Sequence, residues 1–143
     1  MKRLIIILIF ITTLTSCSNK NCECIVAFKS EYTYPESEFN VVYLEMNGQT
    51  YCLKESHIEE LLNLINDKRN YLDGDCGTTF KDGVFIFINK KNGNCEIVSK
   101  IQFGCNYGQL YFMPDNPNPS SMYGHLTLEA SELLRKIVVD IIN

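Results

Sequence analysis

The chain has 143 residues, of which 13 are Lys or Arg and 17 are Asp or Glu, so its net charge near neutral pH is −4. This length fits a single domain, and 45% of the residues are hydrophobic, which is enough for a buried core. The mildly acidic balance argues against a nucleic acid or an anionic lipid surface as the partner.

The first segment of the chain has the pattern of an export signal. Lys2 and Arg3 supply positive charge, and the uncharged stretch from Leu4 to Leu14 consists mostly of Leu, Ile and Phe. A positive start, a short apolar core and small residues after it are typical of a secretory signal peptide. A membrane-spanning helix needs about 20 apolar residues, and this stretch is shorter. We therefore expect export and cleavage rather than a permanent transmembrane helix.

The end of this segment, Leu14-Thr15-Ser16-Cys17, resembles the lipobox of bacterial lipoproteins. The resemblance implies cleavage before Cys17, a diacylglycerol on the Cys17 thiol and an acyl chain, such as palmitate, on its new amino group. The alternative is an ordinary signal peptide cut nearby, although the segment contains no Ala-x-Ala cleavage site.

The resemblance also implies a division of the chain and a location. Residues 1–16 would be the removed signal peptide, 17–21 a lipidated tether, and 22–143 a single disulfide-containing domain. Ser18 is similar to the residue that follows the lipidated cysteine in the outer-membrane class. We therefore expect a lipid-anchored protein of the bacterial cell envelope, at the outer membrane and facing the periplasm.

Six cysteines follow Cys17 in the sequence. An even number of cysteines in an exported chain favours disulfide bonds, and six allow 15 connectivities. A zinc site would be expected to show paired Cys-x-x-Cys motifs, as would a redox-active pair, whereas the one close pair here is Cys-Glu-Cys. We therefore predict up to three disulfides and no metal site. The disulfide candidates are Cys22, Cys24, Cys52, Cys76, Cys95 and Cys105.

Two of the pairings among these cysteines are excluded. Cys22 and Cys24 are too close in sequence to bond without strain, so each is expected to have its own distant partner. Cys95 and Cys105 end one predicted strand, and ten residues of strand separate them by about 33 Å. Bonded Cα atoms lie within about 7 Å, so these two cysteines are not expected to bond to each other.

The first half of the domain is predicted to contain three strands and a helix. Residues 22–29 have strand composition, and residues 39–46 and 49–54 flank Asn47-Gly48, the dipeptide most typical of a two-residue hairpin turn. Such a turn pairs Leu44 with Tyr51 and Tyr43 with Cys52. A helix follows from Ser56 to about Arg69, because Ser56 and Glu59 form a capping box and apolar residues recur at helical spacing.

The second half is predicted to contain a longer hairpin, a last strand and a closing helix. Residues 84–91 and 95–105 flank another Asn-Gly pair and are expected to pair Val84 with Ile101, Ile86 with Ser99 and Ile88 with Ile97. The last strand spans 109–113, and the closing helix runs from its N-cap Thr127 to Ile142.

A loop with three prolines, residues 114–125, joins the last strand to the closing helix. Structureless loops of this length in compact domains often carry binding residues. Met122, Tyr123 and His125 near its end are therefore the candidate binding residues.

These elements predict an α+β fold, with an antiparallel sheet of about six strands and two helices in the order β-β-β-α-β-β-β-α. The chain contains no Gly-x-Ser-x-Gly, His-Glu-x-x-His or glycine-rich phosphate motif, so we expect no enzyme activity and no cofactor. The remaining loop carboxylates are interpreted as solvated acids.

Three functional hypotheses follow from these observations: a binding module, an enzyme and a structural subunit. The enzyme would need a carboxylate pair built from loop acids, and the absence of a catalytic motif disfavours it. The anchor, the disulfides and the tyrosine-rich loops favour a non-catalytic binding module that recognises a protein or a small ligand. A sharper form of this hypothesis is an immunity or inhibitor lipoprotein directed against an envelope-acting toxin or hydrolase. The third hypothesis is an accessory structural subunit of an envelope complex.

Overall fold

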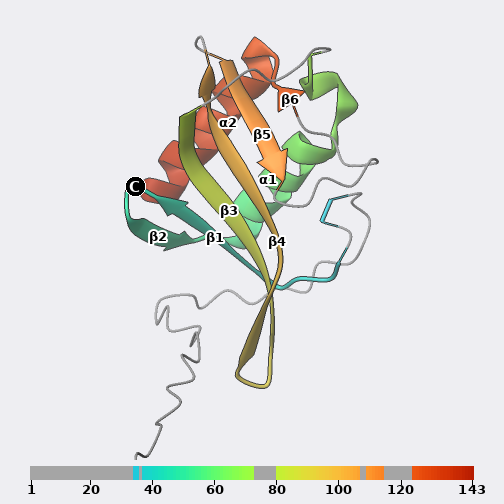
Figure 1. Cartoon of the computed structure of the whole chain (residues 1–143), viewed down its shortest axis with the longest axis vertical. Coiled ribbons are helices and arrows are strands. Elements are labelled where there is room, and N and C mark those ends of the chain that lie inside the picture. Colours follow the sequence, from blue (N-terminus) through green and yellow to red (C-terminus); the bar gives the residue numbers. More distant parts are fainter. Residues whose placement is uncertain (1–33, 36, 73–79, 107–108, 115–123) are drawn as a thin grey trace, which may run out of the picture.

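The computed structural model of the chain describes residues 34–35, 37–72, 80–106, 109–114 and 124–143. Within these ranges the chain forms one antiparallel sheet and two α-helices (Figure 1), which confirms the α+β class. The elements are β1 (Val41–Met46), β2 (Gln49–Cys52), α1 (Glu55–Asn66), the 3-10 turn η1 (Lys68–Asn70), β3 (Phe80–Lys91), β4 (Asn94–Asn106), β5 (Gln109–Pro114), β6 (Gly124–His125) and α2 (Leu128–Ile142).

The sheet has the strand order β2-β1-β3-β4-β5-β6, with the long β3–β4 hairpin at its centre. The order along the chain is β-β-α-β-β-β-β-α, which differs from the predicted one. The predicted first strand, residues 22–29, lies outside the described residues. The predicted loop 114–125 ends in β6, because Gly124 and His125 pair with β5.

The β1–β2 hairpin has the register that its Asn-Gly turn predicts. Tyr43 lies opposite Cys52 and Leu44 lies opposite Tyr51. Asn47 and Gly48 both adopt positive φ, 53° and 73°, the backbone conformation that a tight hairpin turn of this kind requires.

The β3–β4 hairpin departs from the predicted register in its middle. Ile88 lies opposite Ile97, as expected, but Ser99 lies opposite Phe87 instead of Ile86, and Ile101 lies opposite Phe85 instead of Val84. The register shifts between Phe87 and Ile88. A bulge places one extra residue in one strand and reverses the face of every later side chain of that strand. The hydrophobic pattern of the sequence did not reveal this bulge.

Both helices pack on one face of this sheet and enclose the main core. Phe85 and Phe103 stack in its centre with ring centroids 5.1 Å apart. Gly83 lies beside this pair, and a Cβ at this position would approach the Phe103 ring to 2.6 Å. Since Phe103 is almost fully buried and cannot move aside easily, this position in β3 requires glycine.

Of the two predicted helix caps, the one at α1 is wrong and the one at α2 is confirmed. The N-cap of α1 is Lys54 without a side-chain hydrogen bond, so the prediction of a Ser56 capping box is wrong. Buried Leu53 still pairs with β1 through its amide, and the helix begins directly after it. The predicted cap of α2 is confirmed, since the Thr127 hydroxyl accepts a hydrogen bond from the Ala130 amide at 3.2 Å.

Candidate functional site

A cleft of about 690 Å³ opens where η1 meets the start of α2. Two segments distant in sequence form it, the turn that follows α1 and the first residues of α2, at the end of the molecule opposite the β3–β4 hairpin tip (Figure 1). The described residues that line the cleft are Asp67, Arg69, Asn70, Leu72, Thr127, Leu128 and Glu129.

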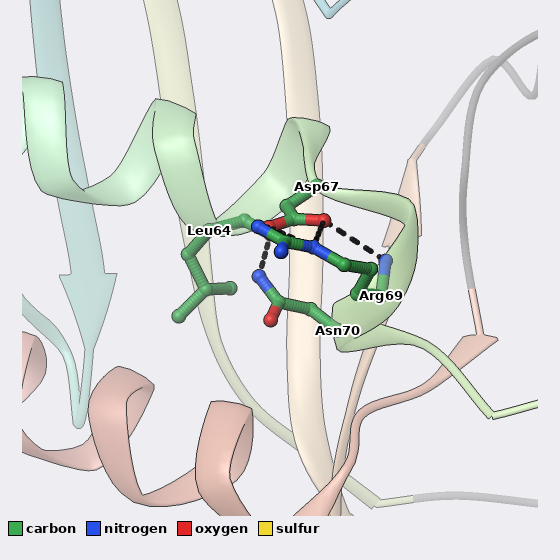
Figure 2. Close-up of polar contacts among 4 residues, drawn as sticks. All are labelled: Leu64, Asp67, Arg69 and Asn70. Carbon is green, nitrogen blue, oxygen red and sulfur yellow. Dashed lines mark hydrogen bonds and ion pairs between the residues drawn. The ribbon is translucent and has the colours of Figure 1, made fainter.

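An ion pair on η1 forms one wall of the cleft. The Asp67 carboxylate accepts hydrogen bonds from Nε and Nη2 of Arg69, at 3.0 and 2.7 Å, and from the Arg69 backbone amide at 3.0 Å. Figure 2 shows the carboxylate enclosed by the side chain and the backbone of the same arginine. These hydrogen bonds fix the direction of the Arg69 side chain, which is 89% exposed. The guanidinium group is therefore pre-positioned at the surface.

The floor of the cleft is held by hydrogen bonds between its two segments. The Asn70 side chain donates to the Leu64 carbonyl of α1 at 2.9 Å (Figure 2). The Asn70 carbonyl accepts from the Thr127 amide at 2.8 Å, and the Leu72 amide donates to the His125 carbonyl at 2.8 Å. Because the two walls are joined through their backbones, the cleft exists before any ligand arrives.

Exposed apolar side chains adjoin this polar wall. Leu72 is 42% exposed and Leu128 is 65% exposed, and both line the cleft. Asp67 and Glu129 contribute negative charge and Arg69 contributes positive charge. Apolar anchors beside a charged and polar rim are the arrangement found in protein-binding surfaces.

The electrostatics of Asp67 argue against this carboxyl acting as a general acid. Hydrogen bonds from the Arg69 side chain and backbone lower the pKa of Asp67 to about 2. A general acid at neutral pH needs a carboxyl with a raised pKa. Asp67 is therefore ionised at neutral pH and holds Arg69 in place through its hydrogen bonds.

We expect the contribution of Asp67 to stability to depend on pH. Its folded pKa is depressed, so the contribution is present above the usual carboxyl pKa of about 4 and is lost as the pH falls from about 4 to about 2. The difference in melting temperature between the wild type and Asp67→Asn should therefore shrink over this range. In an Arg69→Ala background the backbone amide of residue 69 still donates to Asp67, so the pH-dependent difference should become smaller without vanishing. A difference of unchanged size in that background, or one that does not vary with pH when Arg69 is present, would contradict the ion pair.

Tyr71, which precedes Leu72 of the cleft, is a second group with a shifted pKa. The Tyr71 hydroxyl donates to the Ile65 carbonyl at 2.6 Å, and burial, with a smaller contribution from Tyr34, raises its pKa above the usual tyrosine value. Tyr71 therefore stays neutral and ties the segment after η1 to α1.

The structure describes three of the predicted site cysteines. Cys52 and Cys95 are disulfide-bonded, and both pack against the sheet face opposite the helices. Cys105, by contrast, carries a free thiol. The expected lipidation site Cys17 and the disulfide candidates Cys22, Cys24 and Cys76 lie outside the described residues.

The predicted binding loop is described only at its end. Met122 and Tyr123 lie outside the described residues. His125 lies in β6 opposite Tyr111, and its carbonyl accepts a hydrogen bond from the Leu72 amide. His125 is thus next to a residue that lines the cleft, although its side chain is not part of the lining.

Sequence reasoning missed the residues of η1. The periodicity predicted a helix as far as Arg69, but α1 ends at Asn66. There the Asn66 side chain donates to the Leu62 and Tyr34 carbonyls, and the Asp67 side chain caps the next turn. Asn and Asp compete in this way with helical hydrogen bonds, so the pair Asn66-Asp67 was the available signal for a helix end.

A smaller pocket of about 430 Å³ lies between the β1–β2 turn and the start of β3. Glu45, Lys81 and Asp82 contribute the charged groups of its lining. Within the described ranges no cluster of His, Cys, Asp or Glu is arranged to hold a metal ion, and no helix there has the length and apolarity needed to cross a membrane.

Comparisons with protein-family models, curated proteins and solved structures find no match to this chain.

Proposed function

We propose that this chain is an exported, lipid-anchored protein of the bacterial cell envelope whose α+β domain is a non-catalytic binding module. The anchor part of the proposal is supported by the Leu14-Thr15-Ser16-Cys17 motif that follows a short apolar segment. The binding part is carried by the cleft between η1 and α2, where exposed leucines lie beside a fixed ion pair.

The size and chemistry of the cleft favour a protein partner. Its lining mixes two exposed leucines with charged and amide groups, and binding hot spots commonly combine an apolar anchor with a surrounding polar rim. Arg69, held by Asp67, offers an oriented cation to a carboxylate of the partner. The partner segment that fits this cleft is therefore short, apolar and flanked by an acidic side chain.

The proposal is tested with two matched variants of α2. Leu128 and Val139 are both exposed apolar residues of this helix, at 65% and 53%, but only Leu128 lines the cleft. The membrane-anchored protein carrying Leu128→Ser should lose at least about tenfold in partner binding, a typical loss for a hot-spot residue. Val139→Ser should bind like the wild type.

The measurement is quantitative co-purification of cross-linked partners from the native envelope, followed by titration of the partner so identified. Equal binding by the Leu128→Ser and Val139→Ser variants would remove the cleft from the proposal. Failure of the wild type to retain any partner above a Cys17→Ala control would overturn the binding function itself.

A further inference from the structure

The sheet face that points away from the helices is buried, although no described element covers it. Its apolar residues are only 1–7% exposed, and the Tyr43 hydroxyl is buried without a hydrogen-bond partner. Among the described residues, both helices contribute to the core on the other face. This second face consists of Val41, Tyr43, Val84, Ile86 and Ile88.

Two disulfide-bonded cysteines lie on the second face. Cys52 on β2 and Cys95 on β4 both pack against this apolar cluster. They are not bonded to each other, because β1 and β3 lie between their strands and three strand spacings amount to about 14 Å. Bonded Cα atoms lie within about 7 Å. The partner of each is therefore another cysteine of the chain.

Chain length narrows the choice of partner for Cys95. Since Cys105 is free, the candidates are Cys17, Cys22, Cys24 and Cys76. Cys76 precedes Phe80 by four residues and so lies within about 14 Å of it. Cys95 lies opposite Lys90 on β3. Lys90 is ten residues after Phe80 on the same strand, a distance of about 33 Å. Cys76 therefore cannot reach Cys95.

We propose that Cys95 is bonded to Cys22 or Cys24, and that this disulfide fastens residues 22–29 over the second face. The exclusion of Cys17 rests on the proposed function, in which its thiol carries lipid. In an extended chain, alternate residues share one side. Val26 and Phe28 therefore lie on the same side as the two cysteines and supply the apolar surface that covers the sheet.

The length of chain before the described residues permits this arrangement. Ten residues separate Cys24 from Tyr34, enough to span about 35 Å. Tyr34 is fixed near β4, since its hydroxyl is hydrogen-bonded to Ser99 at 2.5 Å and to the Lys100 carbonyl at 3.0 Å. Ser99 is four residues from Cys95, or about 13 Å along the strand.

The disulfide has a consequence for how the domain is presented. Cys95 lies beside the tip of the β3–β4 hairpin, whereas the cleft lies toward the other end of the sheet (Figure 1). Only five to seven residues separate Cys17 from the proposed disulfide, or at most about 25 Å. Together with the proposed anchor, this places the hairpin end next to the membrane and turns the cleft away from it.

Peptide mapping of the full chain tests the proposal, because trypsin separates Cys95 from each of its candidate partners and leaves Cys22 and Cys24 together in one peptide. The chain is purified from the envelope without reductant, its free thiols are blocked, and linked peptides are identified by mass spectrometry. Cleavage after Lys and Arg gives these cysteine-containing peptides: 17–20, 21–29, 30–54, 70–81, 92–100 and 101–135.

We expect peptide 92–100 to be linked to peptide 21–29, and the link to persist in a Cys105→Ser control. A link from 92–100 to 17–20, 70–81 or 101–135, to 30–54 without 21–29, or to a second copy of itself, would overturn the proposal, as would a free Cys95 thiol. The mass of peptide 17–20 reports acylation independently. A missing acyl mass with an intact 92–100 to 21–29 link would refute the anchor and leave the disulfide standing.

Discussion

Replacing Phe85 with alanine is expected to lower the free energy of unfolding by about 3–5 kcal/mol. Phe85 is fully buried, lies on the central strand β3 between Leu44 and Ile101, and stacks on Phe103. The substitution removes a large apolar surface and leaves a cavity that the rigid sheet cannot close. A small domain is stable by only about 5–15 kcal/mol, so this loss is a large fraction of the total.

Urea unfolding followed by circular dichroism measures the effect. With a slope of about 1–3 kcal/mol per molar urea, the midpoint should fall by about 2 M. Ile97→Ala is the matched control, because Ile97 lies on β4 and is 53% exposed, and it should change the free energy by less than about 1 kcal/mol. A similar small loss in Phe85→Ala would contradict the shared core beneath the two helices.

Replacing Cys17 with alanine is expected to move the protein from the membrane fraction to the soluble fraction. One acyl chain holds a protein weakly, whereas two or more chains anchor it firmly, at about 0.8 kcal/mol per buried methylene. Loss of the lipidation site should remove all chains together. The ratio of membrane-bound to soluble protein should therefore fall at least about 100-fold, as measured by fractionation after a high-salt wash.

Cys105→Ala is the control for this experiment, because Cys105 is a free thiol of the domain and plays no part in the proposed anchor. Its fractionation should match that of the wild type. If the Cys17→Ala protein remained in the washed membranes although residues 1–16 had been removed, the domain would bind the membrane directly, and the lipoprotein proposal would be wrong.

The two hairpins illustrate how far local sequence patterns determine this fold. Asn47-Gly48 specified the turn and, through it, the pairing of Leu44 with Tyr51, because a two-residue turn leaves no freedom in register. The same reasoning placed the β3–β4 turn correctly but failed beyond Ile88. There a bulge shifts the register, and its position depends on which side chains the core accepts rather than on the turn.

The candidate site could not be predicted because its two walls are far apart in sequence. Asp67 and Arg69 belong to the first wall because α1 ends at Asn66 and η1 follows it. Leu128 belongs to the second wall, which the hydrogen bond from the Thr127 amide to the Asn70 carbonyl joins to the first. The sequence placed its candidates instead in the proline-containing loop, where the described end, His125, supports the cleft through its backbone.

The sequence by itself determined the α+β class, the first hairpin, the Thr127 cap and the expectation of an anchored, disulfide-containing chain. These follow from turn chemistry, capping and apolar periodicity, which act between residues near one another in the chain. Only the tertiary structure decided the strand order, the bulge in β3–β4 and the cleft. Those features depend on burial and hydrogen bonds between distant segments, which no local pattern encodes.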